Sequence, residues 1–191
     1  MTRRSTPKWI LKKQANRSAQ IRFMEMFLML PEGGVKMEFP NTHSCEARLF
    51  EVRWPDVVRC LSCGGSDIGS VEKRFLYQCR TCRRQFSLTT ETVVHRSRLD
   101  LRMWFIAAEE IISAYAESRE EIRLIGHSMA KRYGISYPAL HRLKKILIED
   151  LSQQPGGGLI GACVCVRPTP LLRDPKASEE DWRDQLRSAM Q

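Results

Sequence analysis

The most constraining feature of this 191-residue sequence is the spacing of four of its seven cysteines. Cys60 and Cys63 flank two residues, Cys79 and Cys82 flank two more, and fifteen residues separate the pairs. Each C-x-x-C turn can aim two sulfurs at one ion, and Gly64 gives the first turn conformational freedom. Four thiolates complete the tetrahedral shell of Zn²⁺, so the pattern predicts one structural zinc with no open position for a substrate.

The alternatives for these cysteines are two disulfides or four free thiols. No apolar run is long enough to cross a bilayer, and the N-terminus has charges where a signal peptide needs an apolar core. We therefore expect a cytoplasmic, nucleoid-associated protein, and in a reducing compartment a disulfide framework is disfavoured.

The segment between the cysteine pairs is predicted to contain a strand of a zinc ribbon. Phe75, Tyr77 and Cys79 alternate with Leu76 and Gln78, which is typical of a half-exposed strand. A segment this small cannot bury enough apolar surface to fold alone, so bound zinc is expected to contribute most of its stability, on the order of 10 kcal/mol. Loss of zinc should therefore unfold the ribbon.

The charge of the chain indicates a polyanionic partner. The formal net charge is +9, and residues 1–24 contain seven basic residues and no acidic residue. Arginines on a metal-held hairpin suit phosphate contacts because little conformational freedom remains to be lost on binding. A solvated basic surface is the alternative. The basic residues in question are Lys73, Arg74, Arg80, Arg83, Arg84, Arg96 and Arg98.

Three helices are predicted after the ribbon. Asp100 is a plausible N-cap of the first, and Ser118 with Glu121 forms a capping-box pattern for the second. Gly134 is expected to end the second helix, and Ser136 is expected to cap the third. Two helices joined by a short turn with glycine are typical of a helix-turn-helix.

The second helix of such a motif reads the major groove of double-stranded DNA with its N-terminal residues. A three-helix bundle that does not contact DNA is the alternative. The candidates for base contacts are Ser136, Tyr137, His141 and Arg142, and those for phosphate contacts are Lys144 and Lys145.

The whole chain is predicted to be a small α+β protein, with a four-Cys zinc ribbon followed by a helix-turn-helix-like bundle. A flexible basic arm is expected over residues 1–24 and short helices that pack on the ribbon over 25–54. The ribbon is expected over 55–98, the helix-turn-helix-like helices over 99–151, and a linker with a poorly ordered tail over 152–191. Within that tail, residues 159–166 are expected to form an isolated strand and residues 179–190 a weak helix.

These residues resemble the zinc-ribbon class of bacterial DDE-type insertion-sequence transposases. The resemblance covers roughly residues 23–151 and departs at Val57 and Leu61, where that class usually has Gly and Pro. It rests on the segments RWPD (53–56), RCLSCG (59–64), YQCRTCRRQFSLTT (77–90), LRMWF (101–105) and MAKRYGISY (129–137).

The resemblance implies recognition of transposon-end DNA. Such transposases continue into a domain whose acidic residues hold two catalytic metal ions, and the forty residues after Leu151 are too few for it. We therefore expect no enzymatic activity from these residues alone, with a catalytic transposase subunit or a second copy of the chain as candidate partners. The alternative functions are a stand-alone transcriptional regulator and a zinc ribbon that contacts another protein.

Overall fold

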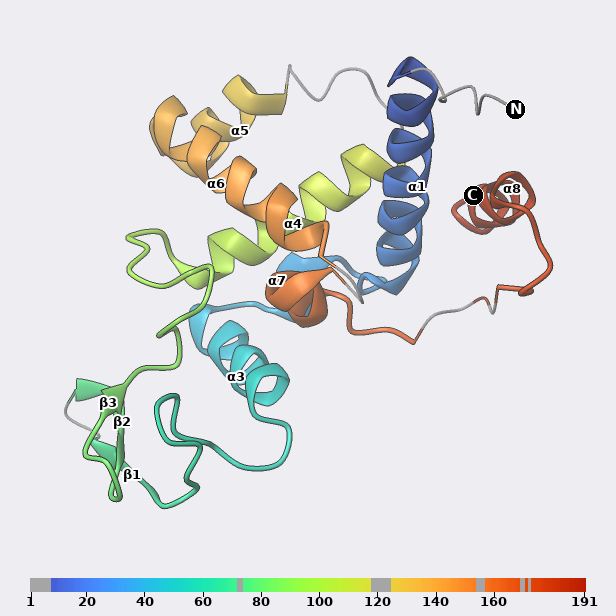
Figure 1. Ribbon diagram of the computed structural model, residues 1–191. Coiled ribbons are helices and arrows are strands. Elements are labelled where there is room, and N and C mark those ends of the chain that lie inside the picture. The colour runs from blue at the N-terminus through green and yellow to red at the C-terminus, as the bar shows by residue number, and fades with distance from the viewer. Residues whose placement is uncertain (1–7, 72–73, 118–124, 154–156, 169–170, 172) are drawn as a thin grey trace.

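The computed structural model of the chain describes residues 8–71, 74–117, 125–153, 157–168, 171 and 173–191, with only the backbone of 8–17 and 125–128. The helices gather around one core, and the three-stranded sheet lies at the far end of α3 from most of them (Figure 1). The predicted small α+β fold is confirmed. Among the described residues, no helix has both the length and the apolar character that a membrane crossing requires.

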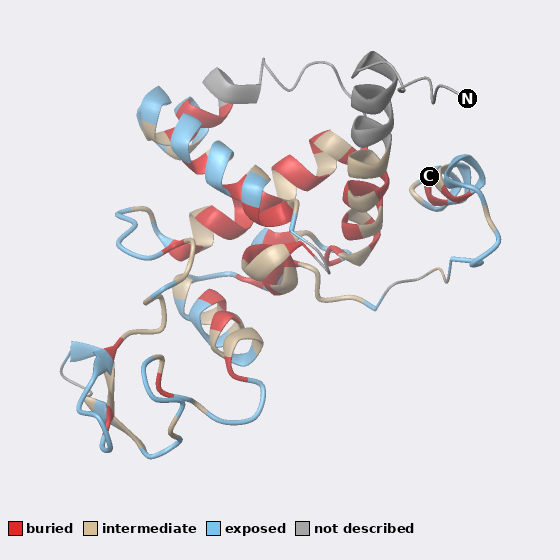
Figure 2. Ribbon diagram, in the orientation of Figure 1, coloured by how far each residue is buried: buried red, intermediate tan, exposed pale blue. Residues whose placement is uncertain are grey.

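Helix α4 (Leu101–Ala116) is the centre of the helical core. Its first turn is capped as predicted, because the Asp100 carboxylate accepts a hydrogen bond from the Arg102 backbone N–H at 2.7 Å. Trp104, Phe105 and Ile112 are buried on it. Figure 2 shows buried positions along α4 and on the helices around it. Burial of side chains as large as these stabilises the folded state by roughly 1.5–3 kcal/mol each.

Helix α1 (Lys8–Met29) packs on α4 rather than on the ribbon. The ring centroid of Phe23 lies 4.6 Å from that of Tyr115 on α4. The helix ends at Met29, shortly before Pro31, but it begins at Lys8, so the structure has no boundary at residue 24. The prediction that this helix packs on the ribbon is wrong, because α4 offers a larger apolar surface than the small sheet does.

Helix α3 (Thr42–Arg53) makes the expected connection between the helices and the ribbon. Asn41 and Ser44 form a capping box at its start, and the short helix α2 (Val35–Glu38) precedes it. The ring of Phe50 lies 6.3 Å from that of Tyr77 in the sheet. Of the two predicted short helices, α3 is therefore the one that packs on the ribbon.

The zinc-ribbon sheet consists of β1 (Ile68–Val71), β2 (Leu76–Cys79) and β3 (Gln85–Phe86), in the order β1-β2-β3 with antiparallel pairing. Ile68 pairs with Cys79 and Tyr77 pairs with Phe86. The predicted strand between the cysteine pairs is confirmed over β2. Cys79 ends β2, so the sheet register fixes the position of one metal ligand directly.

The two helices expected on either side of a short turn with glycine are present as α5 (Ile125–Tyr133) and α6 (Tyr137–Leu151). Gly134 ends α5 with a positive φ of 63°, and the Ile135 N–H donates to the Ala130 carbonyl at 3.1 Å. The Ser136 hydroxyl caps α6. The predicted capping box at Ser118 and Glu121 lies outside the described residues.

The expected strand over residues 159–166 is wrong, because this segment forms helix α7 (Gly158–Val164). Ile160, Cys163 and Val164 are fully buried, and their spacing is that of one helical face. The Asp150 carboxylate accepts hydrogen bonds from the Leu159 and Ile160 N–H groups, at 3.2 and 2.8 Å. The last turn of α6 thus holds the first turn of α7.

The weak helix that the sequence predicts over residues 179–190 is present as α8 (Glu179–Ala189), but it packs on α1 and is not part of a poorly ordered tail. Trp182 and Leu186 are buried, and the Trp182 indole N–H donates to the Glu25 carboxylate of α1 at 2.8 Å. The Ser178 side chain caps the helix. The weak apolar pattern of this segment therefore has a partner in α1, which could not be seen from the segment itself.

Candidate metal centre and nucleic-acid interface

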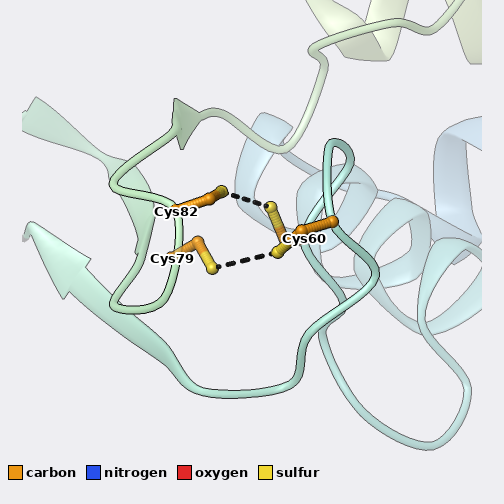
Figure 3. A group of neighbouring side chains, drawn as sticks. Cys60, Cys79 and Cys82 are labelled. Carbon is orange, nitrogen blue, oxygen red and sulfur yellow. Dashed lines mark hydrogen bonds between the residues drawn. The ribbon is translucent and has the colours of Figure 1, made fainter.

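The four predicted ligands converge on one point. Their sulfur atoms all lie within 4.8 Å of one another, with 3.4 Å between the Sγ atoms of Cys60 and Cys82 and 3.6 Å between those of Cys63 and Cys79 (Figure 3). Zinc–sulfur bonds of about 2.3 Å in a tetrahedron place the sulfurs about 3.8 Å apart. The cluster fits this arrangement, and the chain has a structural zinc site.

The two C-x-x-C turns have the same backbone geometry. The Gly64 N–H donates to the Cys60 carbonyl at 3.0 Å, and the Arg83 N–H donates to the Cys79 carbonyl at 2.9 Å. Gly64 and Arg83 both have a left-handed φ, of 71° and 63°. The sequence indicates this conformation at Gly64 but gives no sign of it at Arg83, because arginine has no preference for it.

Backbone N–H groups prepare the cysteines for metal binding. Those of Cys63 and Ser62 lower the pKa of the Cys60 thiol to about 6, and that of Cys82 lowers the pKa of Cys79. At Cys63, the Gly65 N–H favours the thiolate, but the hydrogen bonds with the neighbouring sulfurs outweigh it and raise the pKa to about 12. Four adjacent thiolates therefore need a cation between them, and zinc supplies that charge.

An aromatic cluster joins the ribbon to α3. The Trp54 ring lies 5.4 Å from Tyr77 and 6.1 Å from Phe86, measured between ring centroids. The Arg53 guanidinium lies 4.6 Å from the Trp54 centroid and donates to the backbone carbonyls of Leu88 and Thr90. Sequence reasoning missed this role of Arg53, although the residue stands in the RWPD segment.

The predicted ribbon arginines fall into two groups. Arg80 pairs with Asp67 at 3.4 Å, and Arg84 pairs with Glu91 at 2.5 Å. Arg74 and Arg83 are exposed and form no ion pair with any of the described residues. Because exposed pairs are weak and easily exchanged, Arg80 and Arg84 can still reach a phosphate. Lys73 lies outside the described residues.

The segment between the ribbon and α4 carries two further predicted residues, Arg96 and Arg98. Both are exposed, and Arg96 has a left-handed φ of 57°. In Figure 1 this segment links the ribbon to the helical core. This segment thus adds two exposed arginines between the ribbon and α4.

The predicted residues of α6 lie at its exposed N-terminal half. Tyr137 is 46% exposed, and its ring lies 6.4 Å from that of His141. Arg142 and Lys145 are exposed, while Lys144 is half-buried and desolvation lowers its pKa. The Ser136 hydroxyl accepts from the Ala139 N–H at 3.4 Å and retains its own proton for donation.

The opposite face of α6 belongs to the core. Leu140, Leu143 and Leu147 are buried. This packing fixes which side chains of α6 face solvent. The exposed residues therefore form a defined surface rather than a flexible one.

Comparisons with known proteins agree with the zinc site. Residues 40–85 match the family described as "Transposase zinc-ribbon domain". Over 102 residues the chain is 29% identical to the "Uncharacterized protein in transposable element ISH50" of Halobacterium salinarum. That match covers 52% of this chain and 33% of the relative, so the chain spans about a third of the relative's length. No solved structure matches the chain.

The fold and the four-cysteine site therefore define a zinc-ribbon protein, and its residues 40–85 are similar to transposase zinc ribbons. The match includes Asn41 at the start of α3 and ends at Gln85 in β3. It thus covers α3, the strands β1 and β2 and all four cysteines. The predicted resemblance to transposase zinc ribbons is confirmed.

Proposed function

We propose that this chain is a zinc-dependent DNA-binding protein that recognises transposon-end DNA and has no catalytic activity of its own. The observation that carries the proposal is an exposed arginine, Arg83, held in a strained backbone conformation on the zinc-binding turn of a transposase-type ribbon. A left-handed arginine costs about 1–2 kcal/mol of conformational energy. The zinc-binding turn imposes this conformation, so an exposed guanidinium is carried on a fixed backbone, which suits a phosphate contact.

In this proposal the ribbon positions the protein on the DNA backbone. Arg74 and Arg83 are exposed and lack ion-pair partners among the described residues, so they are ready to contact phosphates. Arg80 and Arg84 add phosphate contacts when their exposed ion pairs with Asp67 and Glu91 break. Arg96 and Arg98 extend the same basic region toward α4. Such contacts give affinity without sequence information.

The N-terminal half of α6 reads the bases in this proposal. Tyr137, His141 and Arg142 are exposed there, and arginine can bind both acceptors of guanine in the major groove. Ser136 can donate to a base edge or a phosphate. Lys144 and Lys145 are better placed for phosphates because they lie further along the helix.

We assign no chemical step to the zinc. Its four thiolate ligands leave no coordination position for a water molecule or a phosphate oxygen. Cleavage and joining of DNA would then depend on acidic residues of a catalytic transposase subunit, with this chain acting alone or as a homodimer on the DNA ends. Nucleoid association follows from the same proposal.

A comparison of binding to transposon-end DNA and to shuffled DNA tests the proposal. The zinc-loaded chain is titrated with duplexes taken from the ends of the element that encodes it, and with shuffled duplexes of the same composition. We expect tighter binding to the end sequences and an affinity that falls steeply with salt, because each phosphate contact releases counterions. Equal, weak and salt-insensitive binding to both duplexes would overturn the proposal and favour a protein-contact role.

A further inference from the structure

Phe75 is the least covered large apolar side chain among the described residues. It is 90% exposed and stands immediately before β2, next to the exposed Arg74. Its φ of 51° is left-handed, which is a genuine outlier for a bulky residue. The fold thus holds a phenyl ring in water on a strained backbone. Neither the zinc site nor the aromatic cluster uses this ring.

A groove of about 560 Å³ lies beside Phe75, between α3 and the ribbon. Its walls include Phe50 and Ala47 of α3 and Tyr77 of β2, and they are mainly apolar. His43 and Glu46 stand on the same groove and are exposed. The site therefore combines flat apolar surfaces with polar groups that can bond to the edge of a planar ligand.

From these observations we propose that Phe75 and this groove form a stacking site for an unpaired DNA base. The phenyl ring offers a stacking face, and every base has a face that can stack on it. Arg74 can pair with the phosphate of the same nucleotide, because it is exposed and makes no ion pair with a described residue. The inference rests on the proposed function, since it assumes that the ribbon contacts DNA.

Charge distinguishes this occupant from an apolar peptide. An apolar peptide would cover the groove but would offer no charge to the Arg74 guanidinium, which makes no ion pair with a described residue. A nucleotide satisfies both groups, with the base against Phe75 and the phosphate at Arg74. The Glu46 carboxylate can accept a hydrogen bond from an exocyclic amino group, so a cytosine is a suitable probe.

The experiment compares three DNA probes with the full zinc-loaded chain. One is a duplex with a single unpaired cytosine, the second is the same duplex fully paired, and the third is a single strand of the same sequence. We expect the unpaired cytosine to raise affinity over the paired duplex. Phe75→Ala should remove that preference: its affinity for the probe with the unpaired cytosine should fall by roughly 5- to 100-fold, the loss expected for one base that no longer stacks. Its affinity for the paired duplex should stay unchanged.

Two variants separate stacking from folding. Phe75→Trp keeps an aromatic ring and should retain the preference, whereas Phe75→Gly removes the ring and relieves the backbone strain. Val57→Ala, at another exposed apolar residue of the ribbon region, is the matched control and should behave as wild type. A fluorescent adenine analogue in place of the unpaired base should be quenched by the wild type and not by Phe75→Ala.

The outcomes distinguish the inference from the proposed function. Failure to bind any of the three probes would contradict the proposed function itself. Binding to all three probes with equal affinity, or an unpaired-base preference that survives in Phe75→Ala, would overturn the stacking site and leave DNA binding intact. Loss of the preference in Phe75→Trp as well would also overturn it, because an aromatic ring should suffice.

Discussion

Gly64 and Arg83 occupy equivalent positions in the two halves of the zinc site. Each follows the second cysteine of its pair, each has a left-handed φ, and each donates its N–H to the carbonyl of the first cysteine. The first turn uses the residue that adopts this conformation without strain, while the second uses an exposed arginine. The same backbone turn thus has a structural residue on one side and a candidate phosphate ligand on the other.

Single substitutions at Gly64 and Arg83 should separate the contribution of each turn to folding stability from its contribution to DNA affinity. Arg83→Gly keeps the turn and relieves strain, so the free energy of unfolding should stay unchanged or rise by up to about 1 kcal/mol while DNA affinity falls. Gly64→Ala should lower the free energy of unfolding by about 1–2 kcal/mol, because no atom lies within 4 Å of the new Cβ and only the backbone is strained. Denaturant unfolding and DNA titration measure the two effects. A large loss of stability in Arg83→Gly would contradict the equivalence.

The ribbon and α6 should contribute different parts of DNA recognition. Arg83→Ala with Arg84→Ala should weaken binding about equally for all sequences and reduce the salt slope by about 0.9 for each phosphate that is no longer neutralised. Arg142→Ala should instead change sequence preference, by about 1–3 kcal/mol at the base that it contacts. Titrations of end-sequence and shuffled duplexes at several salt concentrations measure both.

Arg173→Ala, at an exposed arginine of the C-terminal segment, is the control for removal of a positive charge. It should leave both the affinity and the salt slope close to those of the wild type. Wild-type behaviour of the double ribbon variant and of Arg142→Ala would show that neither surface contacts DNA.

The junction between α6 and α7 should be sensitive to one added methyl group. A Cβ at Gly158 would overlap the Asp150 carbonyl oxygen and lie 2.6 Å from the Asp150 Oδ1 atom, and φ is +64° there. Gly158→Ala should therefore lower the free energy of unfolding by roughly 2–4 kcal/mol, from both the clash and the strain. Thermal or denaturant unfolding measures this loss.

Gly134→Ala is the matched control for that variant. Gly134 has a similar φ of +63°, but nothing lies within 4 Å of the position that a Cβ would take, so only strain of about 1–2 kcal/mol is expected. Equal losses in the two variants would mean that Asp150 does not hold the start of α7 as described.

Features that depend on local pattern could be predicted from the sequence. Cysteine spacing indicated the ligand set, and the helix caps at Asp100 and Ser136 followed from residues next to apolar repeats. These features depend on a few neighbouring residues, so no tertiary information is needed to find them. The base and phosphate contacts of the interface stay predictions.

The errors arose where distant segments decide the structure. The apolar run at residues 159–166 suits a strand or a buried helix equally, and Asp150 with the surface of α4 selects the helix. In the same way, α8 has a buried Trp182 only because α1 offers Glu25 and an apolar face. The left-handed conformation of Arg83 could not be predicted from the residue itself, because the turn of the cysteine ligands Cys79 and Cys82 imposes it.

Hydrogen exchange with and without zinc tests the central claim most directly, which is that the metal holds the ribbon as a rigid surface for DNA. The chain is first shown to bind one zinc ion and is then treated with a chelator. We expect the amides of β1, β2 and β3 to lose their protection and DNA binding to fall, while those of α4 stay protected because the described helical core contains none of the four metal ligands. Unchanged protection of the ribbon after complete removal of zinc, or no bound zinc at the outset, would contradict the account.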